Sequence, residues 1–278
     1  MNWDFSVSAK TKLLDIKLRE LISYRDLIFM FFLRDFTVVY KQTILGPIWH
    51  IVNPLLSTLV FAFLFSGIAG MGTDGVPLLL FYFSGTMLWT FYSNCFNNAA
   101  GIFITNAGVF GKIYFPRLAV PIAATFSATL KMLIQFVLLM AFFAYYILAG
   151  NPVRPTAMAM FFPLLILWLG ALGTGIGMVM SALTTKYRDF NLVLGLLLQL
   201  TMFVTPVVYP LSQVPDRFRL FFYVNPLSAP IELFRIWFYG AGWVSPHMVL
   251  ASLGMTAAIL LAGLILFTHV ERTFMDVI

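Results

Sequence analysis

Long runs of apolar residues, separated by short polar segments, dominate the pattern along this chain. Several runs lack acidic side chains and reach about 20 residues, the length that an α-helix needs to cross the hydrocarbon layer. The runs are continuous rather than alternating, so helical spans are favoured over a membrane β-barrel. We predict six transmembrane helices, over about 47–68, 78–100, 118–149, 157–182, 191–210 and 247–269.

The remaining segments have neither the length nor the composition of spans. Residues 10–24 repeat leucines at helical spacing beside several charges, which predicts an amphipathic helix in the membrane interface. A second amphipathic stretch follows over 25–42. The segment 101–117 is polar and interrupted by glycines, so we expect a loop. Residues 211–246 hold short apolar runs with charges and prolines, which predicts two short re-entrant or gate helices on the external side.

The expected fold class is therefore an all-α polytopic membrane protein in three parts. These parts are a cytoplasmic interface region (1–46), a six-span domain (47–270) and a cytoplasmic tail (271–278). Twelve Lys and Arg residues fall in segments on the side of the N-terminus, and four fall on the opposite side. Because basic residues are enriched in cytoplasmic loops, we expect both termini in the cytoplasm.

The amino-acid composition argues against several classes of protein. Only 10% of the residues are charged, whereas a soluble domain has about a quarter. The net charge of +6 is explained by the orientation of the spans and does not indicate a nucleic-acid partner. Cys95 is the only cysteine, so the chain forms no internal disulfide and has no Cys/His metal cluster.

The chemistry of the spans limits how transport could be driven. Ion-coupled carriers place acidic or histidine side chains within the membrane. The acidic residues between positions 47 and 246 all fall in predicted loops; they are Asp74, Asp189, Asp216 and Glu232. The chain has no G-x-x-x-x-G-K-[ST] loop for ATP. The three histidines are far apart in sequence, and no paired carboxylates stand out, so an enzyme is disfavoured.

Four regions carry a family resemblance. They are RDFTVVYKQTILGPIWHIVNPLLSTLVF (34–61), KIYFPRLAVP (112–121), TTKYRDF (184–190), and TPVVYPLSQVP with NPLSAPIELFR (205–215 and 225–235). In this order they resemble ABC-type polysaccharide export permeases, the Wzm and KpsM group. The resemblance implies a permease subunit for lipid-linked, O-antigen-like polysaccharide in the bacterial inner membrane. A teichoic-acid, capsule or drug exporter is the alternative within the superfamily, and an ion-coupled carrier or channel is the alternative from another class.

The same resemblance implies the partners. We expect a homodimer with two cytoplasmic nucleotide-binding ATPase subunits, which would bind ATP and Mg, whereas this chain would hold no cofactor or metal. The substrate would be a glycan linked to undecaprenyl pyrophosphate, reached from the membrane lipid, and no nucleic acid would be involved.

The resemblance also gives roles to particular residues, each with a simpler alternative. The expected ATPase-coupling residues are Val109, Phe110, Lys112, Ile113, Phe115 and Arg117. They would act as exposed apolar anchors and charges, or form an ordinary loop. Arg34 and Asp35 would position lipid head groups at the entrance, or form a local ion pair. Arg217, Glu232 and Arg235 would belong to the external gate, or to an inert cap.

Residues that could line a substrate channel are Tyr82, Trp89, Tyr92, Lys131 and Tyr209. Aromatic walls suit sugar rings, but Tyr and Trp also gather at membrane interfaces. Lys131 lies deep in the third predicted span. It would meet Glu232 or an anionic carrier, or extend to the outer surface. Gly173 and Gly177 have the G-x-x-x-G spacing of closely packed helices.

Overall fold

The computed structural model describes residues 18–41, 46–110, 115–187 and 189–273, and helices make up most of these ranges. In chain order the elements are α1 (Leu18–Ser23), α2 (Arg25–Lys41), η1 (Gly46–Ile48), α3 (Trp49–Phe61), η2 (Ala62–Ile68), α4 (Leu78–Ala100), α5 (Ile102–Thr105), α6 (Ala107–Phe110), α7 (Ala119–Leu148), η3 (Ala157–Phe161), α8 (Phe162–Lys186), α9 (Phe190–Val204), η4 (Leu211–Gln213), α10 (Asp216–Val224), α11 (Ser228–Tyr239) and α12 (Pro246–Thr273).

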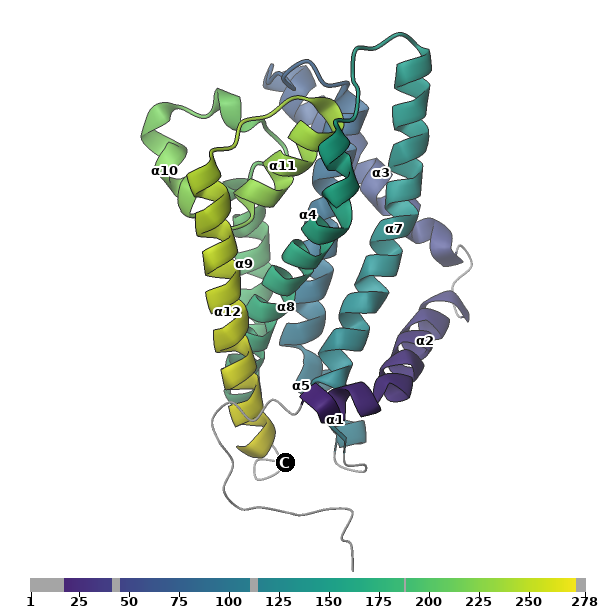
Figure 1. The fold of residues 1–278 in the computed structure, drawn as a ribbon, viewed down its shortest axis with the longest axis vertical. Coiled ribbons are helices and arrows are strands. Elements are labelled where there is room, and N and C mark those ends of the chain that lie inside the picture. Colours follow the sequence, from purple (N-terminus) through teal and green to yellow (C-terminus); the bar gives the residue numbers. More distant parts are fainter. Residues whose placement is uncertain (1–17, 42–45, 111–114, 188, 274–278) are drawn as a thin grey trace, which may run out of the picture.

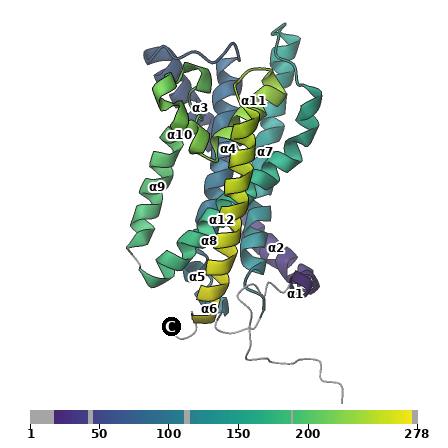
Figure 2. The same ribbon diagram turned by 60° about the vertical axis from the view of Figure 1, so that its left-hand side comes forward.

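The long helices form a bundle with different short elements at its two ends. Figure 1 shows α1, α2 and α5 at one end, near the last residues of α12, and α10 and α11 at the other. The turned view in Figure 2 shows the same separation. We refer to these as the α5 end and the α11 end.

Within the described residues, four helical stretches are long and apolar enough to cross a membrane. They are Trp49–Ile68, Ala119–Leu148, Ala157–Thr185 and Pro246–Glu271. They lie on four of the six predicted spans. The remaining two ranges hold α4 and α9, which lack the hydropathy or the length of these four, so the count of six stays a prediction.

Helix α4 is the centre of the bundle and is covered mainly by α3, α7 and α8. Most of its residues are buried. Because its neighbours are protein rather than lipid, it can carry polar side chains that pair locally. Thr86, for example, lies 3.3 Å from Thr58 of α3, oxygen to oxygen, at hydrogen-bond distance.

Small residues let α8 approach its neighbours closely. A Cβ atom at Gly173 would lie 2.8 Å from the carbonyl oxygen of Tyr92, and one at Gly177 would lie 2.5 Å from that of Phe96. On another face, a Cβ at Gly175 would lie 3.0 Å from Leu260 Cα in α12. The packing interpretation of Gly173 and Gly177 is therefore confirmed.

Helix α9 ends earlier than the sequence-based range 191–210. It stops at Val204, and Thr205 is extended, with φ −108° and ψ 141°. The reason is Pro206, because a proline disfavours helical geometry in the residue before it. The following segment, 205–210, is not a regular helix and leads to α10 and α11.

The N-terminal amphipathic region is described only in part. Residues 10–17 of the expected interface helix lie outside the described residues, and α1 begins at Leu18. Helix α2 packs against α7. The start of α3 is also tied to α7, since the Gln135 side chain donates a hydrogen bond to the His50 carbonyl at 2.9 Å.

Candidate functional site

An ion pair between Glu232 and Arg235 is buried at the α11 end. The two residues are one turn apart in α11, and Arg235 Nη1 lies 2.7 Å from Glu232 Oε1. The arginine side chain is 2% exposed and the glutamate 0%. Two charges removed from water stay ionised at acceptable cost only when each is compensated. The structure thus brings together two of the three predicted gate residues.

The Arg235 guanidinium also joins α11 to other parts of the chain. Nη2 donates to the carbonyl oxygen of Val207 at 2.9 Å, and Nη1 donates to that of Tyr209 at 3.4 Å. The guanidinium carbon lies 3.8 Å from the centre of the Phe81 ring, a cation–π contact. One side chain therefore links α11, the segment 205–210 and α4.

Two glycines permit this arrangement. A Cβ at Gly85 of α4 would collide with the carbonyl oxygen of Val207. Gly242 adopts a φ of +127° after α11, and the next residue, Trp243, donates its backbone N–H to Glu232 Oε2 at 3.0 Å. Sequence reasoning missed both glycines, because their local sequence does not distinguish them from others in apolar segments.

Arg217, the third predicted gate residue, lies apart from the buried pair. It is exposed in α10, and its guanidinium carbon lies 4.7 Å from the Phe218 ring centre. Nearby, Arg219 pairs with Asp216 at 2.8 Å, also on the surface. Helix α10 therefore presents its charges outward, whereas α11 buries Glu232 and Arg235.

The aromatic side chains expected to line a channel lie mainly in the core. Tyr82, Trp89 and Tyr92 are 0%, 9% and 3% exposed. They face other helices of the same chain, so a channel wall made from them would require a rearrangement around α4. Tyr209 is half-buried, and its hydroxyl donates to the Phe203 carbonyl at 2.6 Å.

Lys131 has other neighbours than the sequence suggests. It is half-buried in α7, and its electrostatic partners include Asp35 of α2 and His50 of α3. Glu232 is occupied at both oxygens, by Arg235 and by the Trp243 N–H. Of the alternatives for Lys131, contact with Glu232 is therefore not what the structure has, and contact with an anionic carrier or extension to the outer surface stays a prediction.

At the α5 end, two aromatic side chains of the expected coupling loop are packed into a core cluster. Phe110 and Phe115 are 2% and 4% exposed, with ring centres 5.8 Å apart. The same cluster includes Phe31 of α2 and Phe267 of α12. The expectation that Phe110 and Phe115 are exposed anchors is wrong, because 102–110 folds into α5 and α6 and turns the Phe110 ring inward.

The surface of this segment carries a different apolar side chain. Ile104 of α5 is 51% exposed, whereas its neighbours Ile102 and Phe103 are buried. The sequence did not point to Ile104, because an expected loop has no helical periodicity from which buried and exposed positions could be distinguished. Among the other predicted coupling residues, Lys112, Ile113 and the Val109 side chain lie outside what the structure describes.

Two arginines tie the short helices to longer ones. Arg117 donates from Nη1 to the carbonyl oxygen of Glu271 in α12 at 2.6 Å, and its guanidinium carbon lies 5.4 Å from the Phe110 ring centre. Arg34 of α2 pairs with Asp35 at 2.8 Å. The same Nη2 atom lies 3.4 Å from Asn106 Oδ1, between α5 and α6. The local ion pair is thus present, and a head-group role for Arg34 and Asp35 stays a prediction.

A family model described as ABC-2 type transporter matches residues 26–239. The match runs from the second residue of α2 to the last residue of α11 and contains all the residues that the sequence predicts to function. The chain belongs to the ABC-2 type transporter family.

Relatives of this ABC-2 chain match it over nearly their full length. It is 26% identical to the O-antigen export system permease protein RfbA of Klebsiella pneumoniae, over 91% of this chain and 95% of the relative. It is 24% identical to RfbA of Myxococcus xanthus, over 93% and 97%. The polysialic acid transport protein KpsM of Escherichia coli is 25% identical, over 88% and 93%.

Proposed function

We propose that this ABC-2 protein is the permease subunit of an ATP-driven exporter that moves a lipid-linked, O-antigen-like polysaccharide across the bacterial inner membrane. The similarity to O-antigen and polysialic acid export permeases, over 88–93% of this chain, carries the proposal. Relatives named for two different glycans share it, so the similarity supports the class of substrate and not one particular polymer.

The energy source in this proposal is a separate ATPase. The chain lacks a phosphate-binding loop of the G-x-x-x-x-G-K-[ST] type. The buried acid at the α11 end, Glu232, already has Arg235 as its ion-pair partner, so it is poorly suited to bind and release a coupling ion. Two cytoplasmic nucleotide-binding subunits would bind ATP and Mg and drive a dimer of this chain.

The short helices α5 and α6 would receive the movement of the ATPase. Their outer surface offers Ile104 as an apolar contact. Their inner surface is joined to α12 near Arg117 and to α2 through Arg34 and Asn106. A displacement of α5 and α6 would therefore reach α2 and α12 through direct contacts.

At the opposite end, α10 and α11 would form the external gate. The buried Glu232–Arg235 pair would keep α11, the segment 205–210 and α4 together as one body during opening. Breaking that pair in surroundings of low dielectric constant is costly. Helix α10, whose charges face outward, would be the part that meets the polymer or the lipid head groups.

The proposal also includes a dimer of this chain, with six membrane spans in each copy. The helices α3, η2 and α9 expose apolar side chains along their lengths; among these are Leu56, Val60, Phe63, Leu196, Leu200 and Phe203. In Figure 2, α9 stands at the edge of the bundle. A neighbouring protomer would cover part of this surface. The two termini would lie in the cytoplasm, with α4 and α9 completing the six spans.

Deletion of the gene tests this function. The deleted strain should lose its surface polysaccharide and accumulate the same polymer on a lipid carrier at the cytoplasmic side. A chromosomal copy of the chain should restore export only when its ATPase partner is intact. Normal surface polysaccharide in the deleted strain would refute the proposal. Accumulation of a teichoic acid instead would move the protein to another branch of the family.

A further inference from the structure

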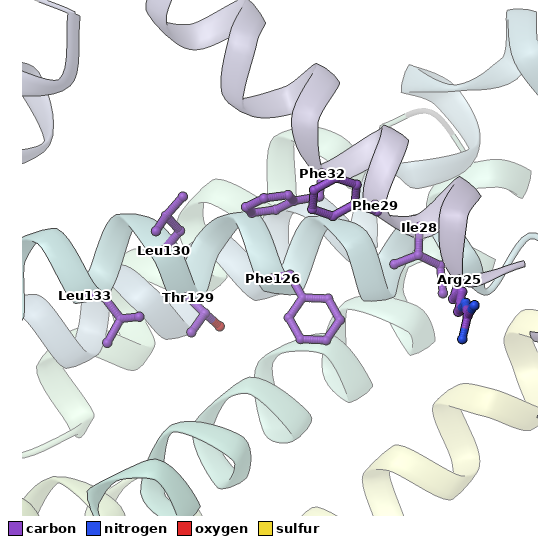
Figure 3. A pocket seen from close by; sticks show the side chains of 8 residues that line it. All are labelled: Arg25, Ile28, Phe29, Phe32, Phe126, Thr129, Leu130 and Leu133. Carbon is purple, nitrogen blue, oxygen red and sulfur yellow. The ribbon is translucent and has the colours of Figure 1, made fainter. Parts of the chain in front are cut away.

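A cavity of about 490 Å³ lies between α2 and α7. This volume is within the range of ligand sites in proteins, roughly 300–1,000 Å³. Four residues of each helix line it; they are Arg25, Ile28, Phe29 and Phe32 of α2, and Phe126, Thr129, Leu130 and Leu133 of α7. Figure 3 shows these two rows.

Each row is one face of a helix. On both helices the lining positions follow the spacing i, i+3, i+4 and i+7, which repeats one side of an α-helix. The lining side chains in these two rows are apolar except for Arg25 and Thr129. The Thr129 hydroxyl already donates to the Thr125 carbonyl of its own helix at 2.9 Å. The walls therefore offer hydrocarbon almost exclusively, which suits an alkyl chain and leaves the hydroxyls of a sugar or the amides of a peptide without partners.

Among the described lining residues, Arg25 alone carries a charge, and it lies at one end of the rows in Figure 3. Its side chain is 83% exposed, and its contact with Asp26 is a surface pair at 3.8 Å. Such a surface pair contributes little to stability, and it leaves the Arg25 guanidinium available to bind an anion. Guanidinium groups bind phosphate in a planar, two-pronged geometry. The cavity thus combines an alkyl-binding wall with a phosphate-binding end.

The dimensions and the charge select the occupant. From Phe126 to Leu133 the α7 wall rises about 10 Å, which covers part of the roughly 15 Å of hydrocarbon in one leaflet. Phe29 and Phe126 are 58% and 57% exposed, so the cavity opens sideways to the surroundings of the chain. The single cation among the described lining residues matches the single charge of a phosphodiester better than the higher charge of a pyrophosphate.

We propose that this cavity binds an anionic phospholipid of the bilayer, with its phosphate at Arg25 and one acyl chain between α2 and α7. The lipid fills the space between α2 and the bundle, and so sets the position of α2 against α7. The proposed ligand is a bilayer lipid and not the transported glycan, so the proposal does not depend on which substrate is exported.

Native mass spectrometry of the purified full chain tests the site. Phosphatidylglycerol and phosphatidylcholine are added in turn to the delipidated protein in detergent. One tightly held phosphatidylglycerol is expected, and Arg25→Gln should weaken its binding by about tenfold or more, as expected for loss of a charge-assisted contact. Thr129→Phe, which places a ring in the cavity, should abolish it. The matched controls are Arg154→Gln, an exposed arginine in the 151–156 loop, and Leu164→Phe, an exposed position on α8.

Three results would overturn the proposal. The first is unchanged phosphatidylglycerol binding in both cavity variants. The second is equal retention of phosphatidylcholine by the wild-type chain. The third is displacement of phosphatidylglycerol by an equal concentration of undecaprenyl phosphate, which would make the cavity a carrier site. Monodisperse elution of each variant in size-exclusion chromatography shows that a loss of lipid is not a loss of fold.

Discussion

The side chains of Glu232 and Arg235 have almost no contact with water, so each charge depends on the other and on the backbone groups around them. Replacing one partner leaves an uncompensated charge and should cost about 3–5 kcal/mol. Replacing both with apolar or neutral side chains of similar shape often costs far less. The pair is therefore open to a double-mutant cycle at the scale of single residues.

We predict that Glu232→Gln and Arg235→Met each lower the thermal stability of the purified chain strongly, and that the double variant recovers much of the loss. Unfolding is followed by thermal-shift chromatography in detergent. Asp216→Asn provides the matched control, because Asp216 pairs with Arg219 at the same i, i+3 spacing but is 85% exposed. That variant should change stability by about 0–1 kcal/mol. Equal losses in the exposed and the buried pair would contradict this account.

The sequence predicts the role of a single residue best where that residue is a charged one among apolar neighbours. Glu232 and Arg235 stand out as charges among apolar neighbours, and the structure brings them into contact. Phe110 and Phe115 were assigned to the wrong side, because the side a ring faces depends on how α5 and α6 fold back. For Lys131 the sequence offers Glu232, an anionic carrier or the outer surface, and charge alone cannot show that both Glu232 oxygens already have partners.

At the scale of elements, the contact between α4 and α8 depends on glycines. A methyl group at Gly177 would meet the Phe96 carbonyl oxygen at 2.5 Å and the Ala99 Cβ at 2.6 Å. Both are backbone or backbone-attached atoms, which cannot move aside independently. Gly177→Ala should therefore destabilise the chain by about 1–3 kcal/mol through overpacking.

Gly195 of α9 provides the control for that substitution. A Cβ there meets nothing within 4 Å, so Gly195→Ala should be neutral or slightly stabilising, as alanine favours helix more than glycine does. The two variants are compared by their midpoint of thermal unfolding. A neutral Gly177→Ala would mean that α4 and α8 lie further apart than the structure has them.

The short helices α5 and α6 permit a clean test of ATPase docking. Ile104 is exposed and Phe110 is buried, so the two positions separate surface binding from folding. Ile104→Asp should reduce co-purification of the ATPase subunit at least about fivefold while the chain stays folded, since it puts a charge into an apolar contact. Phe110→Asp should reduce folded protein itself. Normal ATPase recovery with Ile104→Asp would place the docking surface elsewhere.

Helical elements follow from the sequence wherever the apolar runs are long. The helical stretches Ala119–Leu148, Ala157–Thr185 and Pro246–Glu271 agree with the expected runs to within three residues. Helix α9 ends at Val204, before the end of the expected range, because Pro206 disfavours helical geometry at Thr205 although the apolar run continues. The positions of α5 and α6 were missed because four-residue helices carry no periodic signal of their own.

At the scale of the whole molecule, the exposed face of α9 predicts contact between two copies of the chain. Leu196 is 56% exposed, and Cys95 is buried, so an introduced cysteine would react without interference. Leu196→Cys should give an oxidised dimer on a non-reducing gel. Leu261→Cys on α12, 53% exposed, should stay monomeric. A reversed result would place the dimer contact on α12 and leave α9 to lipid.

The central claim is that this chain exports polysaccharide only with a separate ATPase. Inverted membrane vesicles, containing the chain with or without its ATPase subunit, are given a labelled lipid-linked glycan on their outer, cytoplasmic face, and a glycosidase is then added. We predict that ATP makes the label resistant to digestion only when both proteins are present. Protection by the chain alone, driven by an ion gradient or by nothing, would contradict the account.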